Sequence, residues 1–404
     1  MLTTTAGLHW LASSERERQQ ALEIARALQQ KESRDELGIG SIRDGVADLL
    51  FPGTSTLHTR ARYFLLIPWA YQQAAAHRGS SPLAARVRST EAQLIATLKA
   101  SDHNAGLIGR DAGADLKRMP STLYWQGLYV WNIRSVGGPQ STIERILAGR
   151  TGPRITDDDG EALDAQGLQV WHPNLPPPPE GHPAGASFAL THYEADFLAE
   201  RLLTEPTTRA SVLAGLMTSS VNHGSVANIW GHPDLGLLSG RMRELIEQAR
   251  LFSLLMYGAA LLYNVLLAEL DERDELAGSY RDDMDEWAAD VEAEAESLSE
   301  WALGELWEAT NHVVPAGTRR FVGQWQGEFR QAGPTGLVDS ATARALIAAR
   351  EQSTKGANAR TRNAKALKQW GGASATAPLD FRWSTARVLL DDIRAGLDRS
   401  DAQH

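Results

Sequence analysis

The side chains best suited to chemistry in this sequence are two histidines and two aspartates. His223 and His232 lie nine residues apart in VNHGSVANIWGHP, a composition typical of a loop, while Asp44 and Asp48 lie one helical turn apart. Metal enzymes place their ligands at closer, characteristic spacings such as HExxH, and that pattern does not occur. We therefore expect no metal site, no cofactor and no identifiable catalytic residue.

Other catalytic motifs are also missing from the sequence. It contains no phosphate-binding GxxxxGK[ST] loop, no GxGxxG after a strand and no GxSxG elbow. Asp44 and Asp48 lie on an expected helix beside Arg43, which favours an ion-pair role over a nuclease site. The chain has no cysteine, which excludes disulfides and thiolate sites and fits a cytoplasmic protein.

Charge is distributed unevenly along the 404 residues, whose formal net charge is -10. The stretch 269–308 holds sixteen acidic residues and two basic ones, whereas 319–368 holds ten basic and three acidic residues. The first 150 residues hold eighteen basic and thirteen acidic residues. Because the acidity belongs mostly to one block, it does not argue against nucleic-acid binding by the rest of the chain.

Three basic clusters are the candidates for contacts with phosphate. The densest lies in and after STKGANARTRN, where small polar residues let backbone amides approach an anion; the others lie in HTRARYF and just ahead of an expected helix at Pro120. Solvated surface is the alternative for the densest cluster, and arginines that tie helices together through carboxylates or helix ends are the alternative for HTRARYF. The candidate residues are Arg60, Arg62, Lys117, Arg118, Lys355, Arg360, Arg362, Lys365 and Lys368.

Two further features have alternative interpretations. The acidic block is either a solvated helix face or a docking surface for a basic partner, including the basic segment of this same chain. Trp370, Phe381 and Trp383 either stack on unpaired bases or anchor the core, and we favour the core.

Hydrophobic periodicity predicts a mainly α, multi-helical fold. We expect helices over 14–30, 39–50 and 82–99, one that starts at Pro120, and one that Thr56 caps and Pro68 kinks or ends. The N-terminal helices have features of a helix-turn-helix. Long helices over 237–270 and 276–310 predict an antiparallel hairpin. A last helix is expected over 384–397.

The uncharged run 251–268 is long enough to raise the question of a membrane span. Its polar residues and charged flanks favour a buried central helix, so we expect no membrane partner. The expected regions are a helical domain over 1–134, a Pro/Gly-rich linker or surface excursion over 135–186, a helical hairpin domain over 187–310 and a small mixed basic region over 311–404.

The chain resembles an uncharacterised bacterial family of similar length. The resemblance rests on RDELGIGSIRDGVADLLFPGTSTLHTRARYFLLIPW, GLIGRDAGADLKRMPSTLYWQGLYVW, ARLFSLLMYGAALLYN and KGANARTRNAKALKQWGGAS. The resemblance implies an association with bacterial antiphage defence islands, beside helicase-like and phospholipase-D-like nuclease genes. It transfers no catalytic residue.

These observations favour a non-enzymatic accessory subunit of an antiphage system that binds DNA, a helicase-like or nuclease-like protein, or both. The first alternative is an unrecognised nuclease that uses Asp44, Asp48, Arg60 and Arg62. The second alternative is a scaffold that contacts only protein.

Overall fold

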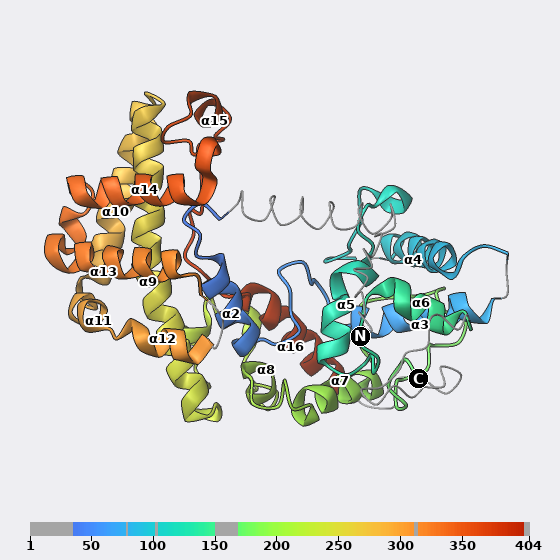
Figure 1. Cartoon of the computed structure of the whole chain (residues 1–404). Coiled ribbons are helices and arrows are strands. Elements are labelled where there is room, and N and C mark those ends of the chain that lie inside the picture. Colours follow the sequence, from blue (N-terminus) through green and yellow to red (C-terminus); the bar gives the residue numbers. More distant parts are fainter. Residues whose placement is uncertain (1–34, 78–79, 102–103, 150–168, 311–313, 400–404) are drawn as a thin grey trace, which may run out of the picture. The chain divides into compact units, whose positions relative to one another are not determined.

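The computed structural model describes residues 35–77, 80–101, 104–149, 169–310 and 314–399, and these residues are mainly helical (Figure 1). Within these ranges the backbone forms no strand, only one isolated bridge between Arg134 and Trp171. The predicted mainly α class is therefore confirmed. The helix expected over 14–30 lies outside the described residues, as does 150–168 of the expected linker.

The chain divides into two compact units, and each unit takes segments from distant parts of the sequence. Unit 1 comprises 1–43 and 251–379, and unit 2 comprises 44–250 and 380–404. These boundaries differ from the four consecutive regions that composition suggested. The physical reason is that contacts between residues more than 300 positions apart hold each unit together, for example from Arg350 to the carbonyl of Leu37 in unit 1.

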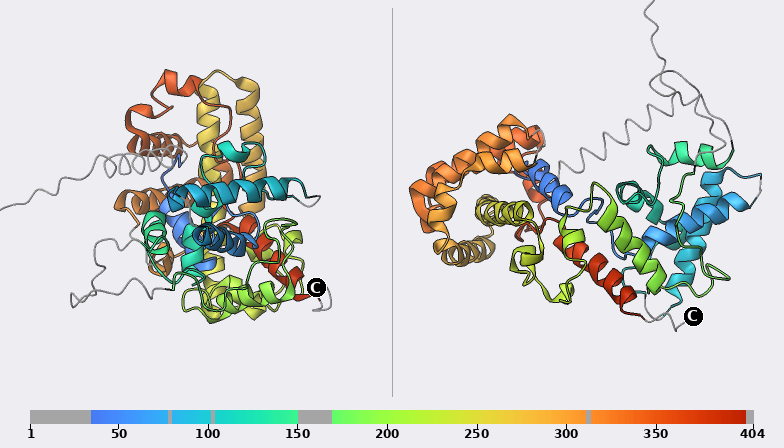
Figure 2. Two further views of the ribbon diagram at one scale, coloured as in Figure 1. Left: turned by 90° about the vertical axis from the view of Figure 1, so that its right-hand side faces the viewer. Right: turned by 90° about the horizontal axis from the view of Figure 1, so that it is seen from below.

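Unit 2 is built around α3 (Tyr63–Ala76), which packs against α4 (Leu83–Lys99) and α5 (Pro120–Val130). The C-terminal helix α16 (Trp383–Leu397) packs along α7 (His192–Thr204), as Figure 2 shows. The remaining elements are short: α6 (Gln140–Leu147), α8 (Val212–Gly215), η1 (Gly113–Asp115), η2 (His223–Ser225), η3 (Ile229–Gly231) and η4 (Leu235–Leu237).

The described part of the Pro/Gly-rich stretch 135–186 belongs to unit 2 and packs against its other elements. Trp171 is buried, and the indole of Trp69 donates to the carbonyl of Pro176 at 2.7 Å. The connection over 100–119 that precedes α5 is much longer than the three- or four-residue turn of a helix-turn-helix. Lys117 and Arg118 lie in that connection.

The expected start of α3 at Thr56 is wrong. Residues up to Arg62 are not helical because tertiary contacts take their backbone amides: those of Thr59 and Arg60 donate to the Tyr124 hydroxyl at 2.8 and 3.1 Å. Pro68 lies inside α3 and does not end it.

Two helices contain a boundary between the units. In α2 (Gly40–Leu50) the boundary follows Arg43, and in α9 (Gly240–Leu270) it follows Arg250. By length and composition α9 alone among the described helices passes as a membrane span, but 83% of its apolar window is buried inside the protein. This burial agrees with the expected buried central helix.

In unit 1, α10 (Asp274–Glu292) returns along α9, and the two lie side by side in Figures 1 and 2. The Trp287 indole donates to the Leu254 carbonyl at 2.9 Å and its ring fills the space beside Gly258, where a Cβ would lie 2.4 Å from the ring. The predicted antiparallel hairpin is therefore confirmed.

The second long helix is shorter than predicted. It breaks into α10, α11 (Ala295–Glu300) and α12 (Leu303–Thr310). The Gln326 amide donates at 2.9 Å to the carbonyls of both Leu298 and Trp301, so a side chain from α13 (Ala316–Gly336) satisfies groups that a continuous helix would bond internally. Unit 1 is completed by α13 (Ala316–Gly336), α14 (Ala341–Lys355), η5 (Gly356–Asn358) and α15 (Ala364–Lys368).

Candidate nucleic-acid interface

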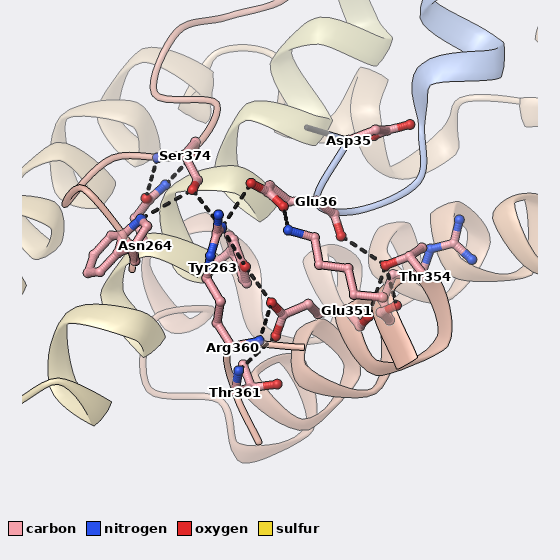
Figure 3. A network of polar contacts seen from close by, with 12 residues as sticks. Asp35, Glu36, Tyr263, Asn264, Glu351, Thr354, Arg360, Thr361 and Ser374 are labelled. Atoms are coloured by element: carbon pink, nitrogen blue, oxygen red, sulfur yellow. Dashed lines mark hydrogen bonds and ion pairs between the residues drawn. The ribbon is translucent and has the colours of Figure 1, made fainter. Parts of the chain in front are cut away.

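The densest predicted basic cluster lies on residues 355–374, called here the anchored segment, which follows α14 in unit 1. A buried network of polar side chains fixes its backbone (Figure 3). Glu36 is central: its carboxylate accepts from Arg360 Nη1 at 2.9 Å and pairs with the ammonium of Lys355. The side chains of Glu36 and Lys355 are each only 8% exposed, and Arg360 binds the same carboxylate. Neither Lys355 nor Arg360 is therefore free to contact a phosphate while these two ion pairs persist.

Glu351, at the end of α14, holds the backbone of the anchored segment. Its two carboxylate oxygens accept the backbone amides of Arg360 at 2.8 Å and Thr361 at 2.9 Å. The hydroxyl of Tyr263 from α9 donates to the same carboxylate at 2.6 Å. Burial raises the pKa of Tyr263, and the neighbouring carboxylate raises it further, so the phenol keeps its proton and remains a donor.

The far end of the anchored segment is fixed to α9 by a reciprocal pair of hydrogen bonds. Asn264 donates from its amide to the Ser374 carbonyl at 2.7 Å, and the Ser374 backbone amide donates to the Asn264 side-chain oxygen at 2.9 Å. Trp370 donates from its indole to the Ser374 hydroxyl at 3.2 Å. The segment is therefore held at its middle and at its end.

The exposed side of the anchored segment carries the cations that remain. Arg362 and Lys365 are exposed and, within the ranges that the structure describes, contact no carboxylate. Lys368 pairs with Asp271 at 2.7 Å, yet 74% of its side chain is exposed. This pair is one contact between the acidic block and the basic segment inside unit 1.

In unit 2, both arginines of HTRARYF form ion pairs. Arg60 makes a bidentate contact with Asp392 of α16, with Nη2 to Oδ1 at 2.8 Å and Nε to Oδ2 at 2.9 Å. Arg62 donates to Glu194 of α7 at 2.6 Å, with side chains only 7% and 4% exposed. This is the alternative role stated for these residues, that of tying helices together.

The remaining predicted residues of unit 2, Lys117 and Arg118, are exposed, and no ion pair of either is found among the described residues. The aromatic candidates are not available to bases: Trp370, Phe381 and Trp383 are 5%, 1% and 0% exposed and serve as core anchors. The favoured interpretation of these rings is confirmed.

The carboxylates considered for a nuclease site face one arginine. Arg382 donates to Asp48 at 2.5 Å and lies 3.9 Å from Asp44. Arginine-bound carboxylates are poor ligands for a catalytic metal, because the guanidinium already neutralises their negative charge. Within the described ranges, no group of three His, Asp or Glu side chains is arranged to hold a metal ion.

The two loop histidines lie in contact, which their spacing did not indicate. His232 Nδ1 accepts the Asp234 amide at 3.1 Å, so Nε2 carries the proton and donates to His223 Nδ1 at 3.0 Å. Burial lowers the pKa of both rings, which keeps them neutral. These bonds leave the pair no shared, open ligand position.

Sequence reasoning missed the acidic partners of the anchored segment. One available signal was the spacing of Ala343, Ile347 and Glu351, which repeats every four residues and places a carboxylate on the buried face of α14. A carboxylate on such a face needs a buried donor, and here the donors are two backbone amides and a phenol. Glu36 offered no comparable signal.

Comparison with known proteins identifies a family but no activity. Neither a curated protein nor a solved structure matches the chain. A family model described as a family of unknown function, DUF6361, matches residues 5–396. Because the match covers nearly the whole chain, this protein belongs to the family DUF6361.

Proposed function

We propose that this protein is a non-enzymatic binding subunit that contacts the phosphate backbone of nucleic acid through the exposed side of the anchored segment. The observation that carries the proposal is the contrast on this segment between Arg360, which Glu36 binds, and Arg362 and Lys365, which are exposed without a carboxylate partner in the described structure. A fixed backbone reduces the entropy lost when these cations bind a phosphate.

The expected binding is weak and depends on salt. If Arg362, Lys365 and Lys368 each neutralise one phosphate, log Kd changes with log salt concentration with a slope of about 2.7 for duplex DNA. Affinity then falls roughly 40-fold between 50 and 200 mM salt. Phosphate contacts of this kind carry no sequence information, so binding is expected to be insensitive to sequence.

The test is fluorescence anisotropy with labelled duplex and single-stranded DNA at several salt concentrations. The variant Arg362→Glu/Lys365→Glu is expected to lower affinity strongly and to reduce the salt slope by about 2. The matched control Arg319→Glu/Arg320→Glu makes the same charge change at exposed positions of α13 in the same unit. Equal losses in both double variants would show general electrostatic attraction and would contradict a site on the anchored segment.

A protein partner is the second candidate, and a specific observation favours it. The block 269–308 has sixteen acidic residues against two basic ones. Asp282, Asp285 and Glu286 of α10 are all exposed. Such a surface suits a protein partner with a basic surface. Helicase-like and nuclease-like proteins often have basic surfaces because they bind nucleic acid. Loss of co-purification with the neighbouring gene products in Asp282→Lys/Asp285→Lys would support it, and retention would count against this surface.

The place of the subunit in an antiphage system is proposed on the family resemblance alone. Deletion of the gene from its native cluster is expected to raise the plating efficiency of a phage that the cluster restricts. Unchanged plating across a phage panel on a cluster shown to restrict would contradict this part of the proposal without affecting the DNA-binding test.

A further inference from the structure

A loop of unit 2, residues 219–234, packs on α16 and is called here the histidine loop. Two histidines of this loop, His223 and His232, contact each other and are only 1% and 3% exposed. Both rings lie nearly perpendicular to the indole of Trp383, with ring centroids 6.2 and 5.8 Å from it. The histidine pair therefore lies at the contact between the loop and α16.

Side chains of α16 bind the backbone of the histidine loop over residues 221–226. Asp391 accepts two adjacent amides, those of His223 at 3.0 Å and Gly224 at 2.7 Å. The α16 side chains that donate to carbonyls of this segment are Trp383, Arg387 and Arg394. The loop therefore stays on α16 only while its backbone keeps these amides and carbonyls turned toward the helix.

The hydrogen bonds of the histidine pair accommodate two protons and no third. His232 Nδ1 accepts the Asp234 amide at 3.1 Å, and one proton lies between His232 Nε2 and His223 Nδ1, which are 3.0 Å apart. The second proton is on His223 Nε2, because each neutral ring carries one. A third proton has to enter one of these two bonds and place two donors face to face. Uptake of a proton therefore breaks one of the bonds, whichever ring takes it up.

The surroundings of the pair oppose a positive charge. The charged groups beside the two rings are Asp234 of the loop and Arg387, Asp391 and Arg394 of α16. Burial is the largest influence and lowers the pKa of both rings below 6.5; for His223 the carboxylate of Asp391 opposes this, and His232 and Arg394 add to it. Because the pKa is lowered in the docked loop, the docked state is favoured fully above pH 6.5 and loses stability as the pH falls below 6.5.

We propose that the histidine pair makes the docking of this loop sensitive to acid: a proton taken up by the pair breaks a hydrogen bond inside the loop, and the loop then leaves α16 and exposes Trp383. The helix itself stays in place because it packs along α7. The loop and α16 both belong to unit 2, so this release is independent of the DNA contacts proposed for unit 1.

The test is hydrogen–deuterium exchange of the full chain at about pH 7.5 and about pH 5.5, with rates corrected for the pH dependence of intrinsic exchange. A histidine that is neutral in the docked loop and has its ordinary pKa of 6.5 in the released loop favours release about tenfold more at the lower pH. Peptides from 219–234 are therefore expected to exchange at least about tenfold faster at the lower pH, and peptides from α7 to change less than about twofold. Unchanged exchange of the loop, or equal acceleration in α7, overturns the proposal.

Variants without the histidines separate the pair from other effects of acid. His223→Asn keeps an acceptor near the position of Nδ1, and His232→Gln keeps a donor near the position of Nε2, so the double variant retains a bond between the two side chains without a titrating ring. Its loop exchange is expected to change less than about twofold between the two pH values. His77→Asn, at an exposed position of the same unit, is the control and is expected to keep the full acceleration.

The single variant His223→Asn, which alters the loop least, gives a second measurement. It removes one of the two rings, so the acceleration of loop exchange by acid is expected to be about tenfold smaller than in the natural protein. Acceleration that persists undiminished in either this variant or the double variant overturns the proposal.

Discussion

Two of the predicted basic clusters contain the same short pattern, Arg60-Ala61-Arg62 in unit 2 and Arg360-Thr361-Arg362 in unit 1. In unit 2 both arginines are bound, Arg60 by Asp392 and Arg62 by Glu194. In unit 1 only Arg360 is bound, by Glu36. The partner carboxylates lie 132 to 332 positions away, so the spacing of arginines says nothing about whether tertiary structure occupies them.

The largest expected effect comes from the most buried of these arginines. Arg62→Ala leaves Glu194 buried without its cation and removes a donor to the Ser187 carbonyl. Breaking a buried pair on one side is expected to cost about 3 to 5 kcal/mol of unfolding free energy, measured by urea denaturation. Arg118→Ala, at an exposed position of the same unit, is the control. A loss of unfolding free energy below about 1 kcal/mol would contradict the distinction between arginines in buried ion pairs and exposed arginines.

The second prediction concerns Glu36 of unit 1, where the substitution removes the carboxylate of the ion pair and leaves the arginine in place. Glu36→Gln keeps the shape of the side chain but leaves Lys355 and Arg360 without a counter-charge, and we expect a loss of about 3 kcal/mol. Arg360 is 20% exposed and regains some hydration, so the loss should be smaller than for Arg62→Ala. Glu272→Gln, exposed in the same unit, should unfold at the same urea concentration as the natural protein.

A buried carboxylate that a serine binds sharpens the contrast through pH. Glu91 is 1% exposed and accepts hydrogen bonds from the amide and hydroxyl of Ser121, each at 2.8 Å. Burial raises its pKa from 4.5 to about 7. Because the folded pKa is raised, its contribution is fully present below pH 4.5 and is lost as the pH rises through 7, by about 3 kcal/mol.

Glu91→Gln should remove this dependence. Relative to the natural protein, the variant is expected to gain stability between pH 5 and pH 8, measured as the urea midpoint at each pH. Glu296→Gln, at an exposed position, is the control. Parallel pH profiles for the natural protein and Glu91→Gln would refute the raised pKa.

The smallest expected effect on the unfolding free energy is that of replacing Arg362, the exposed arginine of the pattern in unit 1. Arg362→Ala removes an exposed side chain without a carboxylate partner in the described structure, so its unfolding free energy should change by less than about 0.5 kcal/mol. The same urea experiment measures it. A loss as large as that of Arg62→Ala would mean that Arg362 has a structural role, which would weaken the proposal that it binds phosphate.

Local patterns predicted much of the helical structure but not the tertiary pairings. The helices α2, α4, α5, α9 and α16 follow from periodicity and from proline or glycine boundaries. The late start of α3 depends on Tyr124, and the break after α10 depends on Gln326, both remote in sequence. The basic cluster was visible in the sequence, whereas the division of its cations into bound and exposed ones depends on Glu36 and Glu351.

The interleaved composition of the two units has a consequence for synthesis. Unit 2 lacks α16 until residue 397 has been made, and unit 1 lacks the anchored segment until residue 374 has been made. Domains that fold during translation do so as units. Neither core is therefore complete until the ribosome has passed residue 374, and a stop codon anywhere before α16 leaves Arg60 without Asp392.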